Sequence, residues 1–284
     1  MNLLDIIDHT LSYIPDNPNK DVIFHTHFSS NWYESVGARK LLNSHKYFNP
    51  TIPFIVFTDV AINMMFEQGY NWNNLNSCFT YLIYQYYKDL SFSNVNSIIH
   101  FDADCIITAP LDEIISLITI ENDNKVIGVR NNNDLGKAGK DNAITEFGID
   151  VEKYINAGLL GFIWFNKERS NIIETWVGIS SNNNYSFPFQ EQSVINYLKK
   201  DLIILDPITS DKYYGISGLW GDNSHWDSWK LISVKNNKLF LNSPLNGKEK
   251  QVMILHQAGG HNMNKLSNDM FNNETNKFLE NVSR

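Results

Sequence analysis

The stretch IIHFDADCII, residues 98–107, brings two carboxylates to the end of an apolar strand. Residues two apart on a strand point to the same side, so Asp102 and Asp104 are expected to converge on one spot. Two carboxylates held this close repel each other unless a cation lies between them. Such oxygen ligands favour Mn2+ or Mg2+, which keep coordination positions open for phosphate oxygens. The alternative is a strand end whose acids only face solvent.

Composition narrows the class of protein. A chain of 284 residues that is 43% hydrophobic can bury one large core or two modest ones. Its formal net charge of -8 argues against a nucleic-acid partner, which requires a basic face. Residues 1–15 lack the pattern of a signal peptide, and no apolar run approaches the length of a transmembrane helix. The spacing of Cys78 and Cys105 indicates neither a disulfide framework nor a zinc site, so we expect a cytoplasmic protein.

Apolar runs of strand length alternate with longer helical patterns, which is typical of a mainly parallel sheet covered by helices. Strands are expected at 21–28, 53–58, 97–101, 154–166, 202–205 and 252–255, and helices at 33–44, 75–90, 189–198, 268–282 and from about 110. Residues 130–141 are crowded with Asn, Gly, Lys and Asp, which indicates a mobile loop. This loop is either a lid or a solvated excursion.

Polar residues mark three further elements. Asn156 and Gly158 begin the apolar run 154–166, and His256 ends the run 252–255. Glu191 and Gln192 begin the helix 189–198, where the helix dipole also favours an acid for structural reasons. A lone histidine at a strand end is more often structural than a ligand. The glycines at 259–260 let the backbone approach a phosphate closely.

Four stretches, DADCIITAPLDEI, INAGLLGFIWF, FQEQSVINYL and ILHQAGG, occur in this order. Together they resemble the glycogenin-like family of metal-dependent GT-A glycosyltransferases, and the related bacterial lipooligosaccharide galactosyltransferases, over about residues 25–265. The resemblance implies an α/β GT-A fold, Rossmann-like, with a mixed, mainly parallel sheet and helices on both faces. We expect a single domain over 1–284, with a nucleotide-binding half at about 20–125, a sugar and acceptor half at about 126–265 and a C-terminal helix at about 266–284.

The resemblance also implies roles for individual residues. Asp102, Asp104 and His256 would hold Mn2+, with Mg2+ as the alternative ion, against the diphosphate of a UDP-sugar. Glu191, Gln192 and Asn156 would form the catalytic group beside the transferred sugar. Tyr33, or its neighbour Trp32, would stack on uracil. The remaining donor-binding candidates are Ala103, Gly259 and Lys265, together with His25 and Thr26, which end the first expected strand where open parallel sheets place their ligand crevice.

The chain departs from the family pattern at the diphosphate. The helix before the Asp-x-Asp strand reads Phe-Thr-Tyr-Leu at 79–82 and lacks the usual base, and Asn262 stands where the family has Lys. Either Lys265 and a base of the loop (Lys137, Lys140 or Arg130) contact the diphosphate instead, or stabilisation of the leaving group is weaker. Glu191 stands where the family has Asp, so its carboxylate reaches one methylene further.

Several functions follow from these motifs. The resemblance implies sugar transfer to a hydroxyl of a glycan, lipid-linked or protein acceptor, with retention of configuration. An inverting enzyme would instead use Glu191 as general base. A catalytically weak sugar-binding relative, an Asp-x-Asp phosphatase and a nucleotidyltransferase are the alternatives. In the last helix, Met270, Phe271, Phe278 and Leu279 form one apolar stripe that packs either internally or in a homo-oligomer.

Overall fold

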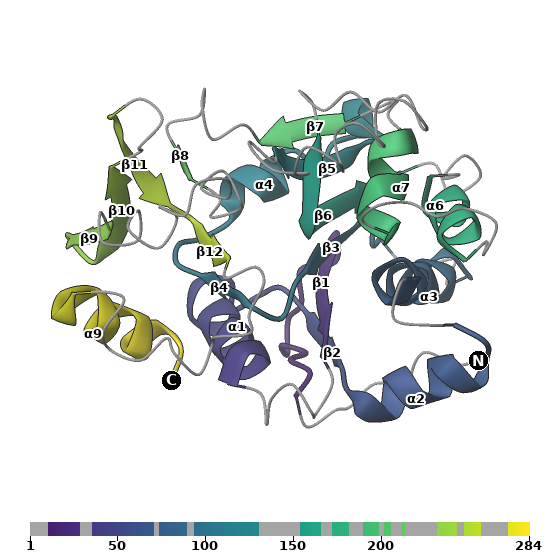
Figure 1. Ribbon diagram of the computed structural model, residues 1–284, viewed down its shortest axis with the longest axis horizontal. Helices are drawn as coiled ribbons and strands as arrows, with labels where there is room; N and C mark the ends of the chain where they lie inside the picture. Colours follow the sequence, from purple (N-terminus) through teal and green to yellow (C-terminus); the bar gives the residue numbers. More distant parts are fainter. Residues whose placement is uncertain are drawn as a thin grey trace.

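The computed structural model describes residues 11–28, 36–70, 74–89, 94–130, 154–165, 172–181, 190–198, 202–205, 212–213, 232–242, 247–256 and 272–284. Within these ranges the main element is a six-stranded sheet with the order β2-β1-β3-β6-β5-β7 (Figure 1). Its strands are β1 (Val22–His27), β2 (Phe54–Phe57), β3 (Ser97–Phe101), β5 (Val126–Arg130), β6 (Ile155–Ile163) and β7 (Leu202–Leu205). β6 pairs antiparallel with β3 and β5, and the other pairings are parallel. The expected mixed, mainly parallel sheet is confirmed.

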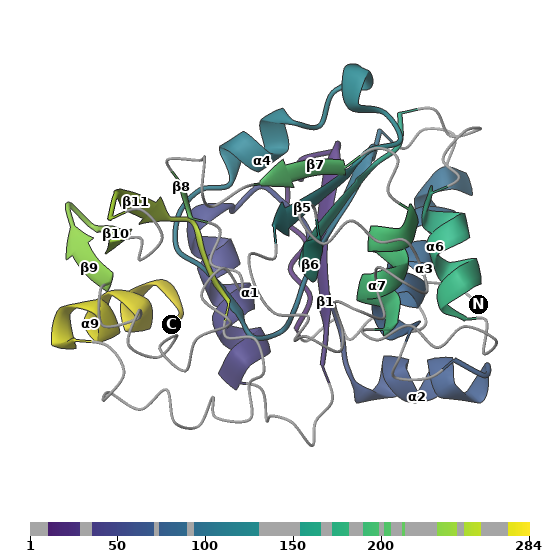
Figure 2. The ribbon, with the colours of Figure 1, turned by 45° about the horizontal axis from the view of Figure 1, so that its top comes forward.

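Helices cover both faces of this sheet. α1 (Val36–Phe48) packs on one face, whereas α2 (Asp59–Glu67), α3 (Leu75–Asp89), α6 (Ile172–Ser180) and α7 (Gln190–Leu198) lie on the other (Figure 2). The short α4 (Asp112–Ser116) and the 3-10 turn η3 (Ile120–Asn122) follow the strand β4 (Cys105–Ile107). In the described part of the chain, no helix is both long enough and apolar enough to cross a membrane.

A second, smaller sheet lies beyond α1 (Figure 1). It has the order β8-β11-β10-β9 and consists of β8 (Lys212–Tyr213), β9 (Ile232–Lys235), β10 (Lys238–Asn242) and β11 (Glu249–Val252). The strand expected at 252–255 is divided: Val252 pairs with β8, whereas β12 (Ile254–His256) pairs antiparallel with β4. The chain therefore changes partner at Met253 and connects the small sheet to the segment that follows β3.

The C-terminal helix α9 (Asn273–Val282) covers the small sheet. Phe278 and Leu279 are buried against Ile232 and Leu241, so these two residues of the expected apolar stripe pack internally. Asn272 caps the helix by accepting a hydrogen bond from the backbone N–H of Thr275. Met270 and Phe271 lie outside the described residues, and oligomerisation stays a prediction.

The loop expected at 130–141 begins later than the sequence indicates. Arg130 is the last residue of β5 and pairs with Ile155 of β6, because the apolar run that precedes it continues the sheet. Residues 131–141, including Lys137 and Lys140, lie outside the described ranges. The strand β5 itself was not expected from the sequence.

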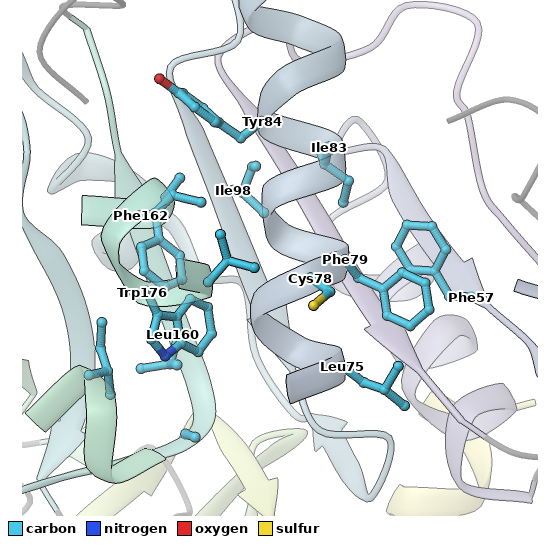
Figure 3. Packing of buried hydrophobic residues seen from close by; sticks show 14 of the residues in the cluster. Phe57, Leu75, Cys78, Phe79, Ile83, Tyr84, Ile98, Leu160, Phe162 and Trp176 are labelled. Atoms are coloured by element: carbon cyan, nitrogen blue, oxygen red, sulfur yellow. The ribbon is translucent and has the colours of Figure 1, made fainter. Parts of the chain in front are cut away.

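The larger core fills the space between the sheet and helices α2, α3 and α6 (Figure 3). Phe79 of α3 stacks on Phe57 of β2, with ring centroids 4.1 Å apart. Phe162 of β6 stacks on Trp176 of α6 at 5.0 Å. All four side chains are fully buried, so α3 is fixed to β2 and α6 to β6.

We expect Phe162→Ala to lower the free energy of unfolding by about 3–5 kcal/mol, because it opens a cavity in a close-packed core. The matched control is Val60→Ala on α2, whose side chain is 64% exposed and whose loss is expected to change stability by at most about 0.5 kcal/mol. Urea unfolding followed by circular dichroism compares the two variants. Equal stability losses in both would contradict the packing described here.

The pH dependence of stability offers a second test. Burial lowers the pKa of His45 to about 4. The hydrogen bond to the Ile52 carbonyl raises this pKa, but its effect is smaller than that of burial. Between pH 6.5 and 4 the unfolded chain therefore binds a proton at His45 that the folded chain does not, so this histidine reduces stability as the pH falls. In His45→Phe we expect the loss of stability across this window to be smaller by about 1.4 kcal/mol per pH unit. Urea titrations at several pH values measure it, and identical slopes for both proteins would refute the assignment.

Candidate functional site

The Asp-x-Asp segment forms a turn rather than a continuous strand. β3 ends at Phe101, and the chain turns through residues 102–104 before β4 begins at Cys105. The N–H of Asp102 donates to the Gly158 carbonyl at 3.0 Å, and the N–H of Cys105 donates to the Asp102 carbonyl at 3.0 Å. The expectation that strand alternation alone aligns the two acids is therefore wrong. Their positions are set by a turn that is hydrogen-bonded to β6.

His256 completes the group of metal-ligand candidates. β12 pairs with β4 so that His256 lies opposite Cys105. His256 Nε2 is 3.0 Å from Asp104 Oδ1 and 3.5 Å from Asp102 Oδ2. Asp104 and His256 are buried, whereas the side chain of Asp102 is 37% exposed. The structure thus brings together the three residues predicted to hold a metal and leaves one side of the group accessible through Asp102.

Asp104 and His256 form a buried pair. His256 Nε2 lies 3.0 Å from Asp104 Oδ1 and 3.5 Å from Asp102 Oδ2, and the two residues compensate each other as an ion pair when His256 is protonated. A carboxylate–imidazole donor set also suits Mn2+. The residues therefore fit the metal that the sequence predicts.

The charges of the group are mutually compensated. Burial raises the pKa of Asp102, but its contacts with His100 and His256 outweigh burial and hold that pKa below its usual value. Burial lowers the pKa of His256, yet the charge of Asp104 and the contact with Asp102 raise it to about 10. At neutral pH the metal-free site therefore carries a proton on His256. A metal ion would take the place of this proton, because metal binding to imidazole requires the neutral form.

Cys105 offers an alternative third ligand. Its Sγ lies within 4.8 Å of ligand atoms of Asp104 and His256, a neighbourhood that the sequence alone did not reveal. Burial raises the pKa of this thiol well above its ordinary value, and Sγ contacts the Gly158 carbonyl at 3.6 Å. A protonated thiol is a poor ligand for Mn2+ or Mg2+, so Asp102 suits these ions better.

Gly158 lies directly behind His256. Gly128 of β5 pairs with Leu160 of β6, but the next residue, Val129, pairs with Asn156, so residues 157–159 bulge out of the β5–β6 ladder. A Cβ at Gly158 would lie 2.3 Å from His256 Cε1. The Gly158 N–H donates to Asn156 Oδ1 at 2.7 Å, which supports the bulge. Only glycine permits this approach of β6 to the histidine.

Helix α7 holds the same bulge from the other side. Gln192 Oε1 accepts a hydrogen bond from the Ala157 N–H at 2.9 Å, and Asn196 binds both the N–H and the carbonyl of Ile155. Gln192 and Asn156 therefore lie at neighbouring points of one hydrogen-bonded segment. Glu191 belongs to the first turn of α7, and its side chain lies outside the described part of the structure.

The other donor-binding candidates have different surroundings. His25 and Thr26 are fully buried in β1, and His25 Nε2 lies 3.0 Å from Thr80 Oγ1. Ala103 is buried within the Asp-x-Asp turn. Tyr33, Gly259 and Lys265 lie outside the described residues, as do Trp32 and Asn262. Their donor-binding roles stay predictions.

His100, which no sequence motif assigned, belongs to the same group. His100 Nε2 lies 3.1 Å from Asp102 Oδ1, and the His100 side chain is fully buried. The available signal was a histidine two residues before Asp102, directly after two isoleucines of β3.

Gly158→Ala tests the close approach of β6 to His256. We expect a loss of about 1–3 kcal/mol in stability from overpacking, together with weaker Mn2+ binding because His256 must move. Gly178→Ala on α6 is the matched control: its new methyl group meets nothing within 4 Å, and we expect a gain of up to about 1 kcal/mol. Urea unfolding and Mn2+ titration measure both variants. Unchanged Mn2+ affinity in Gly158→Ala would show that the close approach is not needed.

Comparisons with known proteins bear on the fold. No protein-family model matches the chain, and no curated protein sequence matches it. Among solved structures, an active-site mutant of LgtC superimposes with a TM-score of 0.50 at 14% identity, covering 83% of this chain and 87% of that one. A glycosyltransferase involved in glycosylation of the major capsid of PBCV-1 has a TM-score of 0.48 at 12% identity, covering 93% and 98%.

The bifunctional glycosyltransferase WbbM has a TM-score of 0.46 at 12% identity, and the match covers 67% of this chain but only 40% of WbbM. Identities this low bear on architecture alone, and of these three matches the one with the LgtC mutant, with its TM-score of 0.50, bears on the fold. The layered sheet described above and this match agree with the expectation from the sequence. The chain has the GT-A glycosyltransferase fold.

Proposed function

We propose that this protein is a glycosyltransferase that moves a sugar from a UDP-sugar to a hydroxyl acceptor with the help of Mn2+, or of Mg2+ as the alternative ion. The observation that carries the proposal is the convergence of Asp102 and Asp104, which follow β3 of a GT-A fold, with His256 of β12. We further propose that the protein works in the cytoplasm as a single domain. Its nucleotide half would be residues 20–125 and its sugar half residues 126–265.

The three candidate metal ligands differ in burial, and each would hold the metal and donor from a different side. Asp104 and His256 supply buried ligand atoms, so they fix one side of the metal position. Asp102, which is partly exposed, lies on the side open to a donor diphosphate. When bound, the metal supplies Lewis-acid stabilisation of the negative charge that grows on the departing diphosphate. The protein's part is to hold these oxygens and the imidazole in place before the donor arrives.

Residues around the β6 bulge would stabilise the transferred sugar during the reaction. Breaking the anomeric C–O bond gives the sugar oxocarbenium character, which a nearby carboxylate and amide oxygens stabilise. Glu191 would supply the carboxylate from the first turn of α7. Gln192 and Asn156, both tied to the backbone of the bulge, would position sugar hydroxyls.

The stereochemical outcome depends on the role of Glu191. With retention, the acceptor hydroxyl attacks on the face of the leaving group, and the diphosphate takes its proton. With inversion, Glu191 would have to remove that proton on the opposite face. We propose retention. Proton NMR of the anomeric signal in the first-formed product distinguishes the two outcomes.

The test is hydrolysis of a panel of UDP-sugars by the purified protein with Mn2+, measured as UDP release. We expect slow release from one donor, its loss on chelation with EDTA, and a decrease of at least about 100-fold in Asp104→Asn and in Glu191→Gln, because each substitution removes charge stabilisation from the reaction. Asp112→Asn, an exposed acid in the first turn of α4, is the matched control and is expected to retain the activity.

Each outcome has a definite meaning. Release that survives EDTA and Asp104→Asn would overturn the metal-dependent mechanism. Binding of a UDP-sugar by calorimetry without any release would favour the weak sugar-binding relative, and absence of both would overturn the glycosyltransferase proposal. Adding glycan, lipid-linked and protein acceptors to the active donor then identifies the acceptor class.

A further inference from the structure

We propose that His100 is a positioning residue for the metal site, which orients the Asp102 carboxylate so that one oxygen faces the metal position. This inference rests on the metal-dependent function proposed above. It concerns a residue of the buried strand β3 that the sequence motifs did not assign.

The geometry of the Asp102 carboxylate carries the inference. His100 Nε2 lies 3.1 Å from Oδ1, and His256 Nε2 lies 3.5 Å from Oδ2. The two oxygens of one carboxylate thus have separate neighbours: His100 holds Oδ1, and Oδ2 is turned toward the histidine that is expected to bind the metal. Rotation of the carboxylate would break the contact with His100.

The direction of this hydrogen bond follows from the chemistry of the two groups. A carboxylate oxygen accepts the hydrogen bond, and an imidazole nitrogen donates it only where that nitrogen carries a hydrogen. His100 must therefore carry its proton on Nε2. Its Nδ1 is buried and has no partner among the described residues. A buried polar atom without a hydrogen bond is unfavourable, so the polar contact that His100 makes within the described part of the site is the one with Asp102.

Neighbouring rings hold His100 in this orientation. In the β1–β3 pairing His25 lies directly opposite His100, and their ring centroids are 4.8 Å apart. The His27 ring stacks on His100 at 6.0 Å and 23°. His25 is itself held by its contact with Thr80. The ring therefore has little freedom to turn away from Asp102.

These neighbours also stay uncharged. Burial lowers the pKa of His25 well below its ordinary value and that of His27 to about 3. At neutral pH two neutral imidazoles flank His100, so they pack against the ring without repelling a bound cation. Residues that hydrogen-bond a metal ligand and fix its orientation typically account for a 10–100-fold difference in metal affinity.

The experiment compares Mn2+ binding by the wild-type protein, His100→Phe and His100→Gln, using the electron paramagnetic resonance signal of free Mn2+ during titration. We expect His100→Phe, which keeps the ring but not the donor, to bind Mn2+ about 10–100-fold more weakly. His100→Gln can offer an amide N–H near the same position, and we expect it to recover most of that loss. Thermal unfolding and circular dichroism check that each variant is folded.

His45→Phe is the matched control, because His45 is an equally buried histidine that hydrogen-bonds a backbone carbonyl away from the site. It is expected to bind Mn2+ as the wild type does. Equal affinity in the wild type and His100→Phe, or no recovery in His100→Gln, would overturn the positioning role while leaving the metal site itself intact. Absence of Mn2+ binding by the wild type would overturn the metal-dependent function, and this inference with it.

Discussion

The acidic pair at 102 and 104 must be compensated where water has little access, and this requirement organises the end of the sheet. A buried carboxylate without a partner is strongly unfavourable. Asp104 is nearly fully buried, and its compensating histidine comes from the opposite end of the chain on β12. The β4–β12 pairing, the turn that contacts β6 and the glycine behind His256 all serve to bring these groups together.

The two sheets have different parts in this arrangement. The six-stranded sheet contains β3, which leads into the turn with Asp102 and Asp104, and β6, whose bulge contains Ala157 and Gly158. The small sheet, covered by α9, anchors the strand that carries His256. Gln192 of α7 hydrogen-bonds the N–H of Ala157 in the same bulge, and His256 lies against the next residue, Gly158. The candidate sugar-binding residue and the candidate metal ligand therefore contact adjacent residues of β6.

Local pattern was sufficient where the local signal is strong. The apolar run before Asp102 predicts β3, and the helical spacing at 75–90 predicts α3. The grouping of His256 with Asp102 and Asp104 came from the family resemblance, not from local pattern, and the fold brings the three residues together. The hairpin between β9 and β10 was not expected, although the sequence carries a signal for it in the Asn-Asn pair at 236–237. Both asparagines adopt the positive φ that two-residue hairpin turns favour.

Other features of the fold and of the candidate site could not be predicted from local sequence pattern. The register shift between β5 and β6 depends on which strands become neighbours, and the contact of His100 with Asp102 depends on the turn that follows β3. The buried state of His25 and Thr26 likewise reflects the packing of α3 over β1. Periodicity along the chain carries no information about these features: the strand pairing and the packing of α3 join distant segments, and the His100–Asp102 contact depends on the conformation of a turn.

The pairing of β12 with β4 has a consequence for the order of folding. The loop between these strands contains most of the second half of the chain, and contacts across so long a separation form slowly, after local and neighbouring elements. The segment from β1 to β4 can thus acquire its strands and helices before His256 arrives. The group of Asp102, Asp104 and His256 is among the last parts of the molecule to assemble, so a nascent chain gains most of its sheet well before these three side chains meet.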